Sequence, residues 1–289
     1  MNYQSDVIKF AEEYAFAYDP QKNQYQKIEM FEYQKKLLKQ FEKQDYTIIK
    51  QSRQVGIDTV MAVYIAYYLM NNSDKQVFAI STNTDCAINF LKKVKTILLY
   101  AKETPAQMNQ KNICLKNLSR ITVSGASFWS NAGRRFEIDF LYINNAESIN
   151  YCRDIWMAAG MALSYKKNAK AILSSVPKFK DSFFHKMWVN AEKKENNFKR
   201  VSVSWKDNPQ LDENWYNAYC LRVSNNPDAI ATELDGKFIK KKATKKAAIN
   251  IRLEPEKKEK ILERMKQKNI SSITEYIMEL INNNLENGV

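Results

Sequence analysis

The sequence is poor in histidine and cysteine, the side chains that most often build metal sites and nucleophilic centres. Its one histidine, His185, lies among aromatic and basic residues with no acidic or nucleophilic neighbour in sequence, so it is expected to pack or to face solvent. The four cysteines are widely spaced and form no CxxC pair. They are Cys86, Cys114, Cys152 and Cys220. We therefore expect reduced structural thiols, no metal and no cofactor.

The sequence also lacks long apolar runs. Charged residues interrupt positions 1–20, which excludes the uninterrupted apolar core of a signal peptide. No run elsewhere approaches the roughly 20 apolar residues that span a bilayer. These absences predict a cytoplasmic protein without membrane contact.

Acidic residues are fewer than basic ones. With 45 Lys+Arg against 32 Asp+Glu, the formal net charge is +13. This balance indicates a polyanionic partner, although charge alone does not separate DNA, RNA and an acidic membrane surface. Hydrophobic residues make up 45% of the chain, which is typical of folded domains, and 289 residues allow one large domain and a small one.

Short β-rich runs alternate with helical patterns through most of the chain. The runs lie at residues 46–49, 77–80, 121–123, 140–143, 171–173 and 201–203, with helical spacing at 59–70 and 84–100. The alternation predicts an α/β domain with a largely parallel sheet over residues 1–239. Residues 1–24 are expected to form a helical extension.

A basic linker at residues 240–246 separates this domain from a C-terminal segment, 247–289, with its own pattern. Residues 248–253 alternate as a strand does, so Ala248, Asn250 and Arg252 share the face opposite the apolar one. Pro255 opens a helix to about residue 268, and Ser271 or Ser272 can cap a second helix.

The two expected helices of this segment carry apolar stripes. The stripe residues are Ile261, Leu262, Met265, Ile273, Ile277, Leu280 and Ile281. A strand and two helices in about 40 residues bury too little apolar surface alone, so a two-fold homodimer is the physical expectation.

This strand-helix-helix pattern resembles the ribbon-helix-helix family of DNA-binding proteins. The resemblance implies that paired strands enter the major groove, while the second helix offers its N-terminus to a phosphate. Arg252 could then contact guanine and Asn250 adenine. The DNA-binding residues expected on this basis are Ala248, Asn250, Arg252, Ser272, Lys240, Lys241, Lys242, Lys245 and Lys246. The alternative is a helical dimerisation appendage whose strand merely pairs.

A second resemblance covers residues 25–238. Residues 51–59 read QSRQVGIDT and lie between an expected strand and helix, where a phosphate-binding loop belongs. They resemble the S-R-Q-x-G-K-[ST]-T loop of the large terminase, the packaging-motor ATPase of tailed phages. Further motifs resemble that family in order along the chain: Tyr33 with Gln34, Arg134, and residues 174–177, 208–209 and 233–238. The resemblance implies a P-loop NTPase-like fold.

The sequence departs from the family pattern at the residues that bind phosphate and magnesium and that activate water. Ile57 stands where the family has the phosphate-binding lysine, and Asp58 where it has the Ser/Thr that holds magnesium. Asn144 and Asn145 replace the Asp-Glu pair that ends the Walker B strand. The residues at nucleotide-site positions are Arg53, Gln54, Gly56, Ile57, Asp58, Thr59, Arg134, Asn144, Asn145 and Ser175. These changes predict a pseudoenzyme, and no DNA cleavage is expected because residues 240–289 stand where the family has its nuclease domain.

Two functions remain open at this point. The first is action on genome packaging in a phage or phage satellite in a bacterial host, through contacts with double-stranded DNA and with terminase subunits or portal. The second is transcriptional regulation, with the ATPase-like domain as a scaffold. A working ATPase with Asp58 as an unusual metal ligand is a further alternative.

Overall fold

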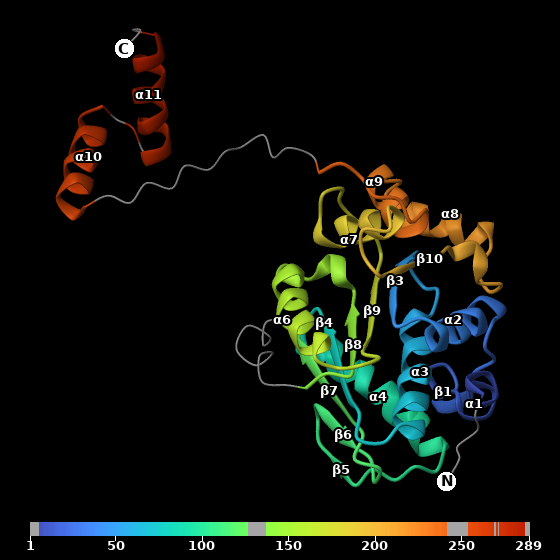
Figure 1. The fold of residues 1–289 in the computed structure, drawn as a ribbon. Helices are drawn as coiled ribbons and strands as arrows, with labels where there is room; N and C mark the ends of the chain where they lie inside the picture. The colour runs from blue at the N-terminus through green and yellow to red at the C-terminus, as the bar shows by residue number, and fades with distance from the viewer. Residues whose placement is uncertain (1–5, 127–136, 242–253, 269, 271, 287–289) are drawn as a thin grey trace. The chain divides into compact units, whose positions relative to one another are not determined.

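The computed structural model describes residues 6–126, 137–241, 254–268, 270 and 272–286. Contacts divide the chain into two units, residues 1–241 and 242–289. The first unit is a layered α/β structure and the second contains a helical pair (Figure 1). In the described part of the chain, no helix combines the length and apolar character needed to cross a membrane.

The centre of the first unit is an eight-stranded sheet with the order β10-β3-β9-β8-β4-β7-β6-β5. The strands from β10 to β7 in this order pair in parallel, whereas β6 and β5 pair antiparallel. Their bounds are β3 Tyr46–Gln51, β4 Gln76–Ser81, β5 Gln107–Met108, β6 Asn112–Cys114, β7 Arg120–Gly125, β8 Phe140–Asn144, β9 Lys170–Ser175 and β10 Lys199–Val203. The predicted, largely parallel sheet is confirmed.

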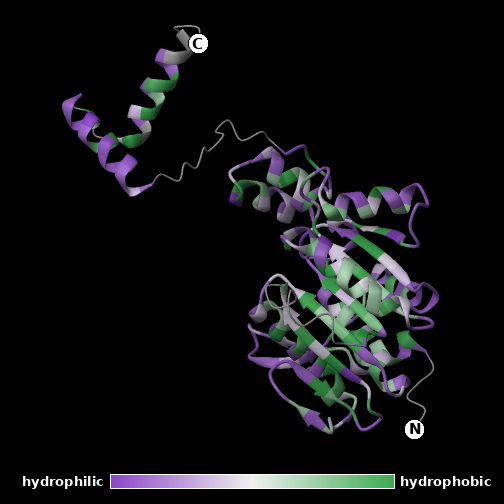
Figure 2. Cartoon of the chain, turned by 60° about the vertical axis from the view of Figure 1, so that its left-hand side comes forward, coloured by the Kyte–Doolittle hydropathy of each residue, from purple (hydrophilic) through white to green (hydrophobic). Residues whose placement is uncertain are grey.

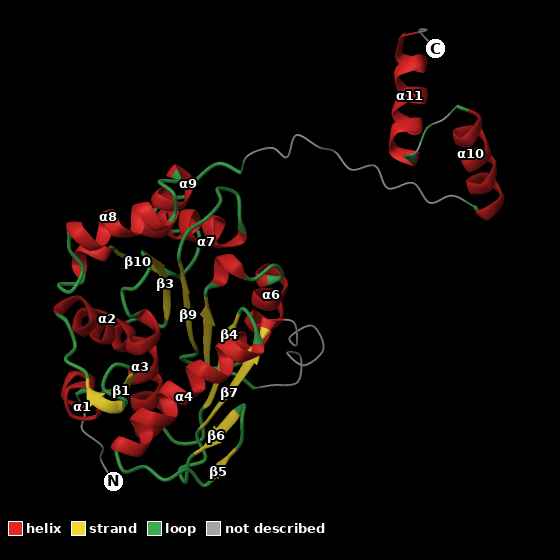
Figure 3. Cartoon of the chain, turned by 180° about the vertical axis from the view of Figure 1, so that it is seen from behind, coloured by secondary structure: helices red, strands yellow, loops and turns green. Residues whose placement is uncertain are grey.

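Helices cover both faces of this sheet (Figure 3). One face packs against α1 Val7–Tyr14, α2 Glu32–Lys43, α3 Ile57–Asn71 and α4 Thr84–Tyr100. The other packs against α6 Cys152–Ser164 and α7 Phe183–Glu192. Strand residues alternate between the two cores: Phe140 and Tyr142 of β8 face the first, and Leu141 and Ile143 the second. Parallel strands buried on both faces explain the continuous apolar runs in the sequence.

Helix α3 is apolar on nearly all sides, which is typical of a helix enclosed by other elements. It packs against α2, α4 and α1 as well as the sheet. Figure 2 shows apolar residues concentrated in the central strands and helices, with polar residues in the outer loops. The loop that precedes α3 therefore leads into the most deeply buried helix of this unit.

The N-terminal segment differs from the expected helical extension. Helix α1 is present, but β1 Phe16–Asp19 and β2 Gln24–Lys27 then pair as an antiparallel hairpin. Phe16 stacks on Tyr100 of α4, with ring centroids 3.7 Å apart. The helical expectation is therefore wrong for residues 16–24, because aromatic packing on α4 favours an extended segment there.

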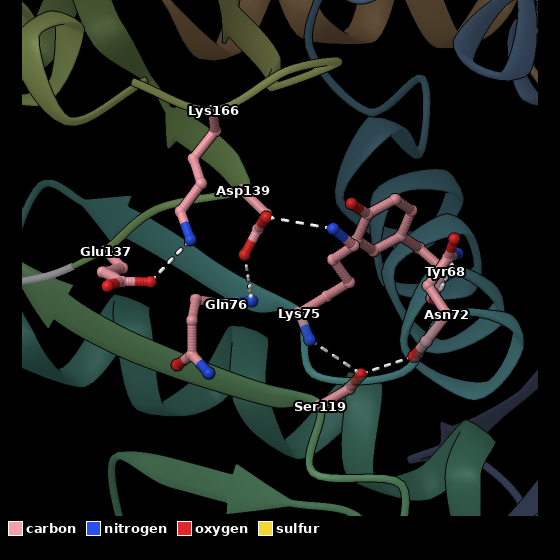
Figure 4. A network of polar contacts seen from close by, with 8 residues as sticks. All are labelled: Tyr68, Asn72, Lys75, Gln76, Ser119, Glu137, Asp139 and Lys166. Atoms are coloured by element: carbon pink, nitrogen blue, oxygen red, sulfur yellow. Dashed lines mark hydrogen bonds and ion pairs between the residues drawn. The ribbon is translucent and has the colours of Figure 1, made fainter. Parts of the chain in front are cut away.

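The amino edge of the sheet carries a polar network (Figure 4). The Asp139 carboxylate, only 5% exposed, accepts a hydrogen bond from the Gln76 backbone N–H at 2.9 Å and pairs with Lys75 at 3.2 Å. Ser119 accepts from the Lys75 backbone and donates to the Asn72 carbonyl. The network joins the starts of β4, β7 and β8.

The remaining elements lie near the carboxyl edge of the sheet or in the second unit. Near the edge are the 3₁₀ helices η3 Ala146–Ser148 and η4 Trp205–Asp207, α8 Glu213–Arg222, α9 Pro227–Ala229 and the π-helix η5 Ile230–Leu234. The second unit contains α10 Pro255–Gln267 and α11 Ile273–Glu286, which pack on each other. Among the residues of this unit that the structure describes, Met265 and Tyr276 are buried. All four cysteines of the chain are free thiols.

Candidate nucleotide-binding site

The loop between β3 and α3 is fixed by three other elements. The Ser52 backbone N–H donates to Val203 O at 2.9 Å, and its hydroxyl donates to Leu234 O at 2.5 Å. The Tyr33 hydroxyl donates to Val55 O at 2.6 Å. Burial raises the pKa of Tyr33 to about 12, so the donor proton is retained at neutral pH. Hydrogen bonds from β10, η5 and α2 therefore support the conformation of the loop.

The backbone at position 56 requires glycine. Its φ of +70° lies in the left-handed region, where side chains are strained, and it caps α3. A Cβ added there would lie 2.9 Å from the Gln34 amide nitrogen. Tyr33 and Gln34, singled out in the sequence as an upstream motif, thus lie directly against the loop.

The side chains of the first turn of α3 point in different directions. Ile57 is 1% exposed and belongs to the core between the sheet and α1–α4. The Asp58 carboxylate is 39% exposed and lies 3.9 Å from Lys93 Nζ of α4. Burial, and then the Asp58 charge, raises the pKa of Tyr142, whose hydroxyl lies 3.0 Å from Ser174 Oγ. The first turn of α3 thus has a buried apolar side chain at the position of the family's lysine and an anion at the position of its Ser/Thr, and the nearby ammonium comes from α4.

Asn144 and Asn145 lie where β8 ends. Asn144 is 3% exposed, and among the described residues its Oδ1 has no hydrogen-bond partner. Asn145 has a φ of +55° and begins η3. Asn144 is in register with Ser174 of β9, so both amides are at the carboxyl edge beside the loop. This is where ligands bind in open parallel sheets.

Ser175 connects two elements behind the loop. Its hydroxyl accepts from the Glu147 backbone N–H at 3.1 Å and donates to Val176 O at 3.0 Å. Glu147 in turn accepts from the Phe179 backbone N–H and the Ser182 hydroxyl. Burial raises the pKa of Glu147. Ser175 therefore ties the end of β9 to η3.

An open cavity of about 440 Å³ lies over the loop. Its lining residues are Gln51, Arg53, Gln54, Val55, Gly56, Ile57, Asp58, Thr59, Lys93, Asn145, Val176, Tyr219 and Arg222. Seven of the ten residues expected at the site line this cavity. Asn144 and Ser175 are not among its lining residues, and Arg134 lies outside the described residues.

Lys93, Tyr219 and Arg222 were missed by sequence reasoning. They come from α4 and α8, which carry no phosphate-loop pattern, so only the fold brings them to the cavity. Lys93 could have been suspected only from its position on the polar face of α4.

Arg53 does not project freely into the cavity. Its guanidinium contacts Glu233 Oε1 at 2.8 Å, and its backbone N–H donates to Glu233 O at 2.8 Å. The hydrogen bond to Glu233 raises the pKa of Arg53, and Tyr219 donates to the other carboxylate oxygen. This clamp joins the loop to η5 and α8.

The cavity is polar but offers little for a metal ion. Asp58 is the one carboxylate among the lining residues, beside the cations Arg53, Lys93 and Arg222. Within the described ranges, no group of three His, Cys, Asp or Glu residues could hold a metal. The arrangement favours an anion over a cation.

The fold matches solved structures of phage large terminases. The HK97 bacteriophage large terminase superposes with a TM-score of 0.67 at 13% identity, covering 82% of this chain and 56% of that one. The Thermus phage P74-26 ATPase domain gives 0.56 at 18% identity, covering 68% and 89%. The large terminase of the thermophilic bacteriophage D6E gives 0.58 at 13% identity, covering 67% and 50%. The chain thus spans about half the length of the D6E and HK97 proteins.

The sequence matches a protein family over residues 48–253, described as terminase large subunit, T4likevirus-type, N-terminal. This range runs from β3 through the loop, the ends of β8 and β9, and the elements that carry Glu233. The match covers most of the chain, and the chain belongs to the family of the terminase large subunit N-terminal domain.

Proposed function

We propose that the chain is a sequence-specific DNA-binding protein with a catalytically inactive terminase-like ATPase domain, acting on phage genome packaging by inhibiting or redirecting a terminase motor. The burial of Ile57 carries the proposal for the ATPase domain. Its side chain lies in the core at 1% exposure, so the position of the family's lysine supplies no cation to the β- and γ-phosphates. Arg53, the other candidate cation of the loop, is paired with Glu233.

The other residues at the site do not fit magnesium and a triphosphate. An ionised Asp58 about 4 Å from a phosphate charge would cost on the order of 4 kcal/mol at an effective dielectric of about 20. Lys93 offsets part of this cost, but it already pairs with Asp58. Neutral Asn144 and Asn145 neither hold magnesium strongly nor accept a proton from water.

Calorimetry with ATP and magnesium tests this part of the proposal. We expect no heat of binding and no phosphate release from the full chain. The Ile57→Lys variant should remain inactive, because the Walker B amides still lack carboxylates. Micromolar ATP affinity or measurable hydrolysis by the unmodified chain would show that the domain is an enzyme.

The DNA-binding part of the proposal is supported by the C-terminal helices. Two helices, α10 and α11, were expected in this segment and are present, and Ser272 directly precedes α11. Leu262, Met278 and Leu280 are exposed apolar residues on these helices, as expected of surfaces that a second copy would cover. Ala248, Asn250, Arg252, Lys242, Lys245 and Lys246 lie outside the described residues.

A double substitution tests how DNA is read. Replacing Asn250 and Arg252 with Ala should remove base contacts worth roughly 1–3 kcal/mol each while phosphate contacts remain. Sequence preference should collapse, and salt-sensitive binding to any duplex should survive. Titrations on a selected and a scrambled duplex measure this, and unchanged preference would mean that another element reads the sequence.

Dimerisation is proposed to reside in residues 247–289. A chain truncated after Lys241 should sediment as a monomer in analytical ultracentrifugation, while the full chain sediments as a dimer. A dimeric truncated chain would place the interface in the terminase-like unit instead.

If the chain acts on packaging, it must bind a component of the packaging machinery. Pull-down from phage-infected cells, analysed by mass spectrometry, should recover portal or terminase subunits if the terminase-like domain binds components of the packaging motor. Recovery of promoter DNA without these subunits would favour transcriptional regulation.

A further inference from the structure

The outer end of the sheet, at β5, forms a groove with α4. Met108 of β5 is in register with Ile113 of β6, so both side chains lie on the same face of the sheet. Ile113 is fully buried in the core that also contains the apolar side of α4, whereas Met108 is 49% exposed. Strand β5 is the last in the sheet, and in the part of the chain that the structure describes no further strand pairs with it (Figure 3). The backbone edge of β5 therefore remains open beside this groove.

A cavity of about 270 Å³ lies in the groove. The residues that shape it are Ile88, Leu91, Lys92 and Lys95 of α4 and Met108 and Ile113 of the β5–β6 hairpin. Leu91 and Ile113 are buried and give the cavity an apolar floor. Cavities that bind small molecules usually exceed about 300 Å³, so this one suits a single aliphatic side chain of a larger ligand.

The turn between β5 and β6 is fixed by one side chain. Asn109 Oδ1 accepts hydrogen bonds from the Lys111 backbone N–H at 2.8 Å and from the Asn112 backbone N–H at 2.9 Å. The Thr122 hydroxyl donates to Asn112 Oδ1 at 2.6 Å, which ties the turn to β7. Met108 is therefore presented next to a preorganised turn, and this lowers the entropic cost of binding a ligand there.

Two lysines of α4 border the apolar floor. Lys92 and Lys95 are three residues apart, so they are neighbours on the helix surface. Lys92 Nζ lies 3.5 Å from the neutral Asn89 amide oxygen. Among the described residues that line the cavity there is no Asp or Glu, so nothing in the groove neutralises the two ammonium groups. A ligand that complements this groove combines an apolar group with negative charge.

We propose that the α4–β5 groove binds an acidic peptide segment of a partner protein, with one aliphatic side chain inserted beside Met108. An extended segment suits the site, because its backbone can pair with the open edge of β5 while alternate side chains enter the cavity. Carboxylates on either side of the inserted residue then lie near Lys92 and Lys95. The inference concerns a protein ligand and stands whether or not the chain binds DNA.

The first test uses the full chain and a fluorescein-labelled peptide with one leucine between two runs of three aspartates. Fluorescence anisotropy at low salt measures its affinity. Replacing the leucine of the peptide with alanine should weaken binding about tenfold, because most of the aliphatic side chain no longer leaves water in the cavity. The inference is wrong if the leucine peptide does not bind, or if the alanine peptide binds equally well.

A charge variant tests whether α4 holds the peptide. Lys92→Ala combined with Lys95→Ala should weaken binding about fivefold through the loss of two exposed ion pairs. The matched control combines Lys36→Ala and Lys39→Ala, which removes two exposed lysines at the same spacing from α2. The control should bind as the unmodified chain does. Equal losses in both variants would mean that only the overall charge attracts the peptide, and this would overturn the inference.

A methionine variant tests the apolar part of the groove. Met108→Glu places an anion beside the cavity and should weaken binding about tenfold, whereas Met157→Glu changes another exposed methionine, in α6, and should have no effect. In spectra of methyl-labelled methionine, the Met108 signal is the one absent from Met108→Leu. Addition of the peptide should shift this signal and leave that of Met157 in place, and the reverse result would contradict the proposed site.

Two competitors test the choice of ligand. Octanoate carries an aliphatic chain and one carboxylate, and a scrambled DNA duplex carries negative charge without an aliphatic group. Unlabelled leucine peptide should displace the labelled peptide at lower concentration than either competitor. Stronger displacement by octanoate or by the duplex would overturn the assignment of a protein partner. Circular dichroism checks that every variant folds.

Discussion

The two edges of the central sheet differ in how their buried side chains are hydrogen-bonded. At the amino edge, the buried Asp139 carboxylate, Lys75 and Ser119 satisfy one another and the backbone (Figure 4). At the carboxyl edge, among the described residues, Asn144 Oδ1 and Gln51 Oε1 are buried without a hydrogen-bond partner. Residues with left-handed backbone lie at both edges: Gln54 and Asn145 at the carboxyl edge, and Asp74, Leu118 and Asn168 before β4, β7 and β9.

The difference shows where this domain tolerates buried polar atoms without hydrogen-bond partners. An unpartnered buried polar group costs on the order of 1–3 kcal/mol, and such groups are found where a fold binds ligands. The carboxyl edge keeps Asn144 and Gln51 unpartnered beside the cavity over the loop. At the amino edge, the hydrogen-bonded network around Asp139 stabilises the fold.

Asp139→Ala should give the largest effect, because it removes the partner of a buried backbone N–H and of Lys75. We expect a loss of about 3 kcal/mol in the free energy of unfolding. Urea unfolding followed by circular dichroism measures it as a lower midpoint at an unchanged m-value. Glu137→Ala is the control, since the exposed Glu137–Lys166 pair should contribute less than about 1 kcal/mol. Equal losses would mean that the network is not what stabilises this edge.

Gly56→Ala should cost about 1–2 kcal/mol, because alanine is strained at a φ of +70°. The contact with the flexible Gln34 amide can relax and adds little. Thermal unfolding of this variant, compared with Gly160→Ala in α6, where an added Cβ meets no atom within 4 Å, measures the strain. A Gly56 variant as stable as the Gly160 variant would show that the loop is free to adopt another conformation.

Asn144→Leu should change the free energy of unfolding by less than about 1 kcal/mol, and stabilisation is the favoured direction. The substitution removes a buried acceptor without orphaning a donor, in contrast to Asp139→Ala. The midpoint of urea unfolding measures the change. A loss above about 2 kcal/mol would indicate that Asn144 has a partner essential to the fold, and the contrast between the edges would fail.

The smallest effect concerns His185, whose pKa is lowered from its ordinary value of 6.5 mainly by burial. Its Nδ1 accepts the Asp181 backbone N–H at 3.1 Å, which requires the neutral ring. Because the folded pKa lies below the unfolded one, its contribution to stability is complete above about pH 6.5 and is lost as pH falls through the folded pKa. Since the chain has one histidine, a single imidazole proton resonance reports the titration, and a midpoint above 6.5 would contradict the assignment.

The sequence was informative where local pattern determines structure. Apolar runs located the parallel strands, and QSRQVGIDT located the loop, because a strand, a tight turn and a helix follow one another there. Arg53, Gly56, Asp58 and Asn145 were therefore predicted to meet. The short strands β5 and β6 and the hairpin β1–β2 were not predicted, since two to four residues carry too little periodicity.

Interactions between distant segments could not be predicted. Lys93 pairs with Asp58 because α4 packs beside α3, and Glu233 clamps Arg53 across 180 residues. The isolated parallel bridge between Phe179 and Ile239 likewise depends on where β9 and η5 end. Such contacts are set by the three-dimensional arrangement, for which no local residue pattern exists.

Ile57 has an evolutionary consequence. Its buried side chain contributes roughly 1.5–3 kcal/mol by leaving water, and an ammonium in the same position would lose that gain and require solvation. Selection for folding alone would thus disfavour lysine at position 57, independently of any effect on activity. If the domain is inactive, as we propose, the buried core around α3 would oppose the return of a phosphate-binding lysine.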